Sequence, residues 1–188
     1  MDLCNIIYAM KRKFYNIKGV EEGCSIRIMF NVLPKELTDI REYDILDLKQ
    51  HVLNMGGKHV VTPRLQTAFG DEGSYYSFSG AVARAHKWTP FLTKVKEYIE
   101  QVTELTFNFV LINKYRDGND SIVSVTIGCV RDFVLKNNST KKSITIPLPH
   151  NSCLIFNEKT NKKYKHSVPV RKKCTSAKYN LTFRTIVN

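Results

Sequence analysis

The chain has 188 residues, of which 43% are hydrophobic and 24% charged. This composition fits one globular domain with a short extension, and it excludes a disordered tail protein and leaves little room for two domains. The charge is strongly basic, with 29 Lys and Arg against 17 Asp and Glu and a formal net charge of +12. A polyanionic partner is therefore expected.

The basic charge is concentrated toward the C-terminus. The last 53 residues, 136–188, contain 12 basic side chains and one acid, Glu158, whereas residues 1–135 are nearly balanced. Because a merely solvated surface usually mixes both signs, this bias favours a surface that contacts nucleic-acid phosphates. A membrane surface and a solvated face are the alternatives.

Neither a zinc site nor a membrane segment is indicated by the sequence. The five cysteines form no C-x-x-C pair, which argues against zinc and thioredoxin chemistry. The apolar stretch at residues 3–10 is short, and Lys11, Arg12 and Lys13 follow it at once, so it fits neither a signal peptide nor a membrane span. We therefore expect an intracellular protein in a reducing compartment.

The first hundred residues predict a mixture of strands and helices. Residues 25–33 alternate as a strand does, and residues 35–55 have a looser helical pattern that ends at Gly56-Gly57. Residues 62–80 predict two short strands around a Gly-Asp turn. Residues 90–104 form the clearest amphipathic helix, with Thr89 as its cap and Pro90 in its first turn.

From residue 105 onward the pattern is that of β-structure. Residues 106–115 and 121–130 alternate, and the five residues between them centre on Asp117-Gly118, which predicts a β-hairpin. Further strands are expected at 131–136, 143–148, 152–157, 163–170 and 178–187. Short strands at this spacing after one helix predict a mainly β barrel or sandwich with helices outside one sheet.

Polar residues alternate along the last predicted strand and share one face: Lys178, Asn180, Thr182 and Arg184. The opposite face is apolar. Two interpretations remain open for this strand, an exposed sheet edge or an anion clamp that lies beside His166. No phosphate-binding glycine loop, G-x-S-x-G or H-E-x-x-H motif occurs.

Seven ordered blocks of sequence carry a family resemblance. They are PRLQTAFGDEG, YSFSG, TFNFVLINKYRDG, GCVRDFVL, IPLPHNSCLIFN, HSVPVRKK and NLTFR. In this order they closely resemble the AlkB homologue 2 and 3 group of iron(II)- and 2-oxoglutarate-dependent nucleic-acid demethylases. The resemblance implies a double-stranded β-helix, or jelly roll, at 62–188 with supporting helices, preceded by a helical and β-hairpin extension at 1–61.

The resemblance also implies cofactors, a reaction and site residues. Members of this group use Fe(II) and 2-oxoglutarate to oxidise an alkyl group on a flipped-out base. The iron ligand that this chain retains is His166. The residues matched to 2-oxoglutarate contacts, or on the same strand face, are Asn113, Tyr115, Lys178, Asn180, Thr182 and Arg184. The nucleobase pocket matches Tyr76, Phe78 and Ser79, and the nucleic-acid backbone contacts are Arg64, Arg171, Lys172 and Lys173.

The chain departs from the family in its metal ligands. The family carries His-x-Asp, its first two iron ligands, after the NKYRDG block, but here Ser121-Ile122 leads straight into Val123-Ser124-Val125. None of the five histidines is followed two positions later by Asp or Glu. The remaining candidates to complete a set of three ligands are Asp117, Asp120 and His150.

Two smaller departures concern the ligand clamp and the duplex. Lys178 stands where the family has the first arginine of its clamp, which keeps the charge but loses the two-pronged geometry. The family's apolar finger matches Met55-Gly56-Gly57, which lacks the central aromatic ring, although Met55 remains able to intercalate.

The sequence therefore supports two functional hypotheses and a third, blander one. By resemblance the chain is an oxidative demethylase of alkylated bases in DNA repair, but without the His-x-Asp ligands we expect it to bind iron poorly and to be inactive as written. The alternative is a non-catalytic nucleic-acid-binding pseudoenzyme, and the third hypothesis is a structural partner protein. For the first two we expect a monomer that binds DNA rather than RNA, in the nucleus rather than the cytoplasm, with no membrane contact.

Overall fold

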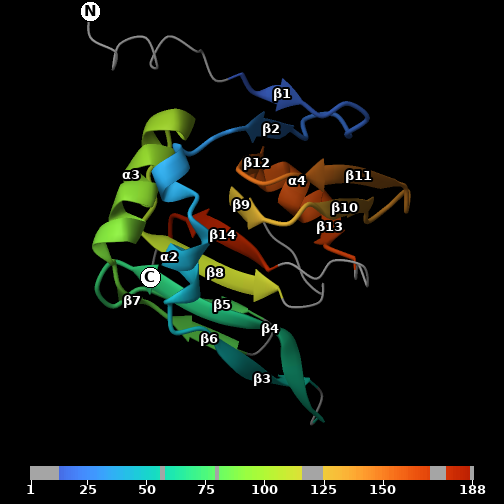
Figure 1. Cartoon of the computed structure of the whole chain (residues 1–188). Helices are drawn as coiled ribbons and strands as arrows, with labels where there is room; N and C mark the ends of the chain where they lie inside the picture. The colour runs from blue at the N-terminus through green and yellow to red at the C-terminus, as the bar shows by residue number, and fades with distance from the viewer. Residues whose placement is uncertain (1–12, 56–57, 79–80, 116–124, 170–176, 187–188) are drawn as a thin grey trace, which may run out of the picture.

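The computed structural model describes residues 13–55, 58–78, 81–115, 125–169 and 177–186 (Figure 1). Helical segments within them are η1 (Lys35–Leu37), α2 (Ile40–Asp44), α3 (Pro90–Thr103) and α4 (Glu158–Lys163). Strands of the first half are β1 (Tyr15–Asn16), β2 (Ile26–Phe30), β3 (Lys49–Met55), β4 (Lys58–Gly70), β5 (Tyr75–Phe78), β6 (Ala81–Arg84) and β7 (His86–Lys87). Strands of the second half are β8 (Phe109–Tyr115), β9 (Val125–Gly128), β10 (Arg131–Asn137), β11 (Ser143–Leu148), β12 (Ser152–Phe156), β13 (Tyr164–Ser167) and β14 (Lys178–Arg184).

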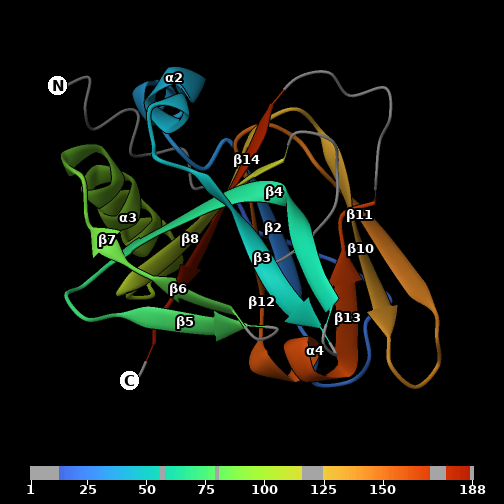
Figure 2. The ribbon, with the colours of Figure 1, turned by 90° about the horizontal axis from the view of Figure 1, so that it is seen from below.

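The strands form one large sheet and two small ones. The nine-stranded sheet has the order β1-β2-β12-β9-β14-β8-β4-β3, and β7 pairs with β4. The three-stranded sheet β11-β10-β13 packs on one part of its inner face, and the hairpin β5-β6 lies beside another part (Figure 2). The predicted mainly β architecture is confirmed.

Helix α3 closes the outer face of the nine-stranded sheet. Its cap is the predicted one, because the Thr89 hydroxyl accepts a hydrogen bond from the Leu92 amide at 3.1 Å and Pro90 occupies the first turn. Its buried side chains Leu92, Val95 and Ile99 join a cluster with residues of β8, β9 and β14. The predicted helix is confirmed, and no helix among the described residues is long and apolar enough to cross a membrane.

The inner face of the nine-stranded sheet is apolar at one end and polar in the middle. At the apolar end the three-stranded sheet packs Phe133 and Leu135 against Ile28 and Leu154, all of them buried. At the far end Ala68, Phe109 and Leu111 form a small cluster against the β5-β6 hairpin. Between these two clusters lies a buried polar zone.

Two predicted elements are wrong. The helical pattern at 35–55 ends in α2, and residues 49–55 are strand β3, because they pair with β4 as far as Met55–Lys58 and this pairing outweighs a weak local preference. The predicted hairpin of 106–115 with 121–130 does not form, because β14 lies between β8 and β9 and pairs with both. The last strand thus supplies a non-local partner that no local turn signal announces.

Gly128 permits the close approach of β14 to β9. Its φ is +97°, and a Cβ built there would lie 2.3 Å from the carbonyl oxygen of Ala177. Any other residue would push the start of β14 away from the sheet. The position of Lys178, the first residue of β14, therefore depends on this glycine.

Candidate functional site

A row of buried polar side chains crosses the inner face of the nine-stranded sheet. Strand register places one from each of five neighbouring strands side by side: Gln66, Asn113, Asn180, Thr126 and Ser152. Within this row the Gln66 amide donates to Asn113 Oδ1 at 2.7 Å, and beside it the Asn180 amide donates to Thr182 Oγ1 at 3.3 Å. Buried polar groups in a folded protein normally have partners, so such a row is a candidate binding site.

The four alternating residues of the last strand lie on this same face. Strand β14 is internal, so the interpretation of an exposed edge is wrong. Lys178 is 1% exposed, and its Nζ has no hydrogen-bond partner in the part of the chain that the structure describes. Its pKa is lowered from 10.5 to about 7, chiefly by burial and also by the nearby positive charge of Arg131, while the charge of Asp132 opposes the change.

Several buried atoms of this zone have no hydrogen-bond partner among the described residues. They are Gln66 Oε1, Thr126 Oγ1, Lys178 Nζ and Arg184 Nε. Each unsatisfied buried group costs about 1–3 kcal/mol, and a cation stands at each end of the β14 segment. This donor set would fit a small dicarboxylate such as 2-oxoglutarate, which Lys178, Asn113, Asn180 and Arg184 would hold.

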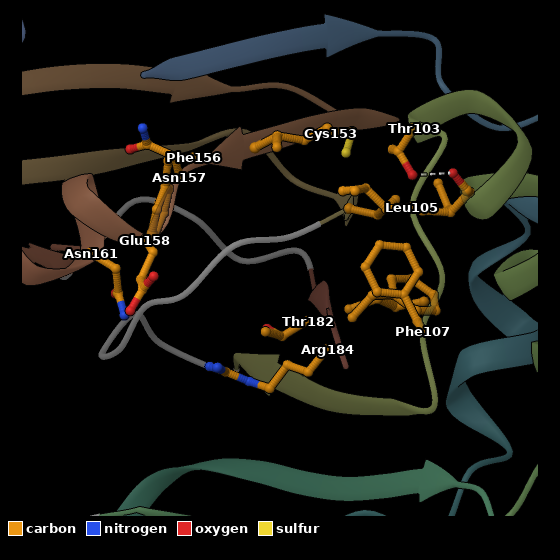
Figure 3. Close-up of a pocket in the computed structure, with 15 residues that line it drawn as sticks. Thr103, Leu105, Phe107, Cys153, Phe156, Asn157, Glu158, Asn161, Thr182 and Arg184 are labelled. Atoms are coloured by element: carbon orange, nitrogen blue, oxygen red, sulfur yellow. Dashed lines mark hydrogen bonds between the residues drawn. The ribbon is translucent and has the colours of Figure 1, made fainter. Parts of the chain in front are cut away.

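Arg184 connects the polar zone to an open cavity. Its guanidinium lies over the Tyr76 ring at 4.2 Å, and burial lowers its pKa. The cavity has a volume of about 240 Å³ and is lined mainly by apolar side chains of α3, β12 and β14. Figure 3 shows Thr182 and Arg184 on one side of it and Glu158 and Asn161 of α4 on the other.

His166 lies on the inner face of the three-stranded sheet among aromatic rings. Its imidazole stacks on Phe133 with ring centroids 5.7 Å apart and an interplanar angle of 12°, and Phe156 lies at 5.8 Å. Its pKa is lowered to about 4, chiefly by burial and also by the positive charge of Arg184. The imidazole is therefore neutral near pH 7, but the same positive potential that opposes its protonation also opposes a divalent cation.

The described residues do not fit a catalytic iron. No group of three or more His, Cys, Asp and Glu side chains among them is arranged to hold a metal ion. His150, a candidate second ligand, is exposed, and its Nδ1 accepts a hydrogen bond from the Gly128 amide at 3.0 Å. The other two candidates, Asp117 and Asp120, lie outside the described residues.

Other predicted site residues are only partly placed. Tyr76 lies on β5, and its ring faces the Arg184 guanidinium, whereas its role in a nucleobase pocket stays a prediction. For three residues the structure describes the strand but not the side chain: Phe78 on β5, Tyr115 on β8 and Arg64 on β4. Ser79, Arg171, Lys172 and Lys173 lie outside the described residues. The matched finger is the hairpin of β3 and β4, whose last described pair is Met55–Lys58.

Two residues of the site were missed in the sequence. Gln66 belongs to the polar row, and the buried Arg131 lies near Lys178 and donates from Nη2 to the Pro169 carbonyl at 3.1 Å. Alternation would have found Arg131, since it shares a strand face with Phe133 and Leu135. Gln66 could be recognised only from the pairing of β4 with β8, which places it beside Asn113.

Comparison with known proteins agrees with this geometry. Residues 32–184 match the 2OG-Fe(II) oxygenase superfamily. The chain is 39% identical over 155 residues to the DNA oxidative demethylase ALKBH2 of Homo sapiens, covering 70% of this chain and 59% of that protein. It is 31% identical over 160 residues to the alpha-ketoglutarate-dependent dioxygenase alkB homolog 3 of Mus musculus, covering 70% of this chain and 56% of that protein.

These alignments cover only part of the relatives. The chain spans between 56% and 65% of the length of the ALKBH2 proteins of Homo sapiens, Bos taurus and Mus musculus. Among solved structures, OsALKBH1 is similar with a TM-score of 0.59 and 14% identity, covering 93% of this chain and 100% of that one. At this identity the likeness concerns the fold alone, and it supports the predicted jelly roll.

Proposed function

This chain belongs to the 2OG-Fe(II) oxygenase superfamily, and we propose that within it the chain binds nucleic acid, DNA in preference to RNA, without oxidising it. The demethylases to which it is similar act on DNA by name, which supports the same class of partner here. A monomer in the nucleus is the state that we expect for such a protein. We also propose that the dicarboxylate site binds its ligand without a metal ion.

The observation that carries the proposal is the environment of His166. A facial triad needs two histidines and a carboxylate with open positions beside them, whereas His166 is flanked by Phe133 and Phe156 and lies in the field of Arg184. Loss of two protein ligands removes the chelate that would hold the ion. Among the described residues, therefore, no group of side chains offers a metal centre for the oxidation of a base.

A like-charge pair on the three-stranded sheet supports the nucleic-acid partner. Lys136 of β10 and Lys165 of β13 stand directly opposite each other, and both are exposed. Like charges in this arrangement destabilise a sheet. Their neighbours Lys162 and Lys163 pair with Glu158 and Glu21 instead. A phosphate bound between Lys136 and Lys165 would relieve their repulsion.

The absence of turnover is tested with methylated DNA, Fe(II), 2-oxoglutarate and the full chain. We expect formaldehyde release no higher than that of the His166→Ala variant, and no iron binding at micromolar affinity in an anaerobic titration. Formaldehyde above the level of the variant would refute the non-catalytic part of the proposal.

Binding itself is tested by fluorescence anisotropy with single-stranded DNA, duplex DNA and RNA of matched sequence. If about five phosphates are neutralised, the affinity for duplex should fall with salt with a log–log slope of about −4.5. Replacing Lys136 and Lys165 together by Glu should weaken binding to all sequences. The same charge change at exposed Lys35 and Lys94, on η1 and α3, is the matched control. Equal losses in the two variants, or a response that is flat with salt, would remove the case for this surface.

A further inference from the structure

We propose that Lys178 couples dicarboxylate binding to the uptake of a proton, so that the site loads at neutral pH and releases its ligand as the pH rises. The inference rests on the dicarboxylate binding proposed above and adds a control that the arginine expected at this position could not provide. The probes are 2-oxoglutarate and succinate, because the two carboxylates are what the site recognises.

The geometry leaves the Lys178 amine without a counter-charge contact. It is 1% exposed, and no described residue accepts a hydrogen bond from its Nζ. Arg131, which is 2% exposed, is a second buried cation nearby, and Asp132 offsets its effect on Lys178 only in part. A buried ammonium in such a place is unfavourable until an anion arrives.

The direction of the coupling follows from the two protonation states. In the ligand-free protein the pKa of Lys178 is lowered to about 7, so above pH 8 the amine is mostly neutral. A carboxylate beside the amine favours the ammonium form and raises this pKa. Binding between about pH 7.5 and 9 therefore takes up as much as one proton, and the affinity falls by up to tenfold for each pH unit. A guanidinium stays charged throughout this range.

The other ionisable groups around Lys178 do not explain such an uptake. Arg184 on the same strand and Arg131 on β10 remain protonated, and Asp132 on β10 is the nearby acid. His166 on β13 has a pKa lowered to about 4 and is neutral throughout the range. His150, which accepts a hydrogen bond from the Gly128 amide beside Lys178, is the remaining imidazole. On β8, Tyr115 is in register with Lys178, and the structure does not describe its side chain.

Calorimetry of the full, metal-free chain separates these groups. Titrations with 2-oxoglutarate at pH 8.5 in two buffers of different ionisation enthalpy give the number of protons taken up. We expect between about half a proton and one proton for the wild type and for His150→Asn, whose side chain can still accept from Gly128. For Lys178→Arg we expect an uptake near zero and an affinity that does not change between pH 7 and 9. Succinate should reproduce the wild-type uptake.

Each outcome decides a separate point. Binding without proton uptake in the wild type, or equal uptake in Lys178→Arg, overturns the coupling and leaves the dicarboxylate site in place. Loss of the uptake in His150→Asn would assign the proton to His150 and also overturns the proposal. If no dicarboxylate binds at any pH from 6.5 to 9, the site itself is refuted. Should Lys178→Arg fail to fold, the pH dependence of the wild-type affinity decides alone, because a flat profile excludes a titrating lysine.

Discussion

The two sheets that enclose the candidate site contribute different chemistry to it. The middle of the nine-stranded sheet presents amides, hydroxyls and two cations, whereas the three-stranded sheet presents mainly Phe133, Leu135, Ile146 and Leu148. On the three-stranded side, His166 stacks on Phe133 and belongs to no metal-binding group of three side chains among the described residues. The candidate dicarboxylate site thus lies on one sheet, and no set of metal-ligand side chains faces it among the described residues.

This difference also means that the packing of the fold does not depend on a metal centre. The polar residues lie on β8 and β14, whose opposite faces carry the core residues Ile112 and Leu181, so these strands are needed for folding in any case. The three-stranded sheet is held by its own apolar cluster with β2 and β12. Neither packing interaction requires iron.

The largest effect should come from Phe133→Ala, which opens the apolar cluster beside His166. Phe133 is 1% exposed and contacts both His166 and Phe156. Truncation of a buried Phe typically costs about 3–5 kcal/mol, and urea unfolding at pH 7 measures it. Thr145→Ala, on the exposed face of β11, is the control and should change the free energy of unfolding by less than about 1 kcal/mol. A cost below about 1 kcal/mol at Phe133 would mean that this cluster does not hold the two sheets together.

Replacement of Lys178 by Met should stabilise the protein in a pH-dependent way. Between the lowered pKa of about 7 and the ordinary 10.5, the unfolded chain binds more protons at this position than the folded one. The wild type therefore gains stability as the pH rises through this window, and its burial penalty is fully present below about pH 7. The difference in pKa corresponds to at most roughly 5 kcal/mol, so we expect Lys178→Met to be more stable by about 2–4 kcal/mol at pH 6.5.

Unfolding at pH 6.5, 8 and 9.5 measures how this gain declines. A gain that is equal at every pH would mean that Met only packs better, with no contribution from the charge of Lys178. Lys142→Met, at an exposed position, is the control and should show no pH-dependent gain.

The sequence predicts those features of the two sheets and of helix α3 that depend on neighbouring residues in the chain. Helix α3 is predicted because its cap, its N1 proline and its apolar stripe all lie within one stretch of chain. The polar face of β14 is predicted because alternation along a strand is a local pattern. Whether that face is a candidate site depends on the burial of β14 inside the sheet, which the structure shows. The family blocks add which ligand such a face would bind.

The parts that depend on strand pairing could not be predicted. The Asp-Gly signal after β8 indicates a hairpin, but β14, more than 60 residues later, occupies the place beside β8. Gln66 enters the polar row only because β4 pairs with β8, and Arg131 approaches Lys178 only because the two sheets face each other. Such contacts are set by global packing rather than by local propensity.

Arg184→Ala should remove most of the stabilisation by 2-oxoglutarate, and His166→Ala should not. At a ligand concentration of 100 times Kd the wild type gains about 2.7 kcal/mol, which for a chain of this size raises the melting temperature by about 5–10 °C. Loss of a charge-assisted contact should weaken affinity at least about tenfold. A thermal-shift series without metal compares the variants. If both lose the shift equally, the two halves of the site are one unit and the contrast drawn between the sheets fails.

The smallest effect concerns the outer face of the three-stranded sheet, where Lys165→Glu should raise stability and lower affinity for DNA. The substitution turns the opposed pair Lys136–Lys165 into an attractive one, which is worth roughly 0.2–1 kcal/mol in a sheet. Removal of one phosphate contact should reduce the salt slope by about 1.

Urea unfolding and anisotropy on the same preparation measure the two changes, and Lys165→Gln separates loss of the repulsion from gain of an ion pair. If Lys165→Glu stabilises the chain but leaves DNA binding intact, the repulsion is not kept for a phosphate ligand. If DNA binding weakens but the free energy of unfolding does not rise, the Lys136 and Lys165 amines do not repel each other measurably in the free protein, and they approach only when DNA binds.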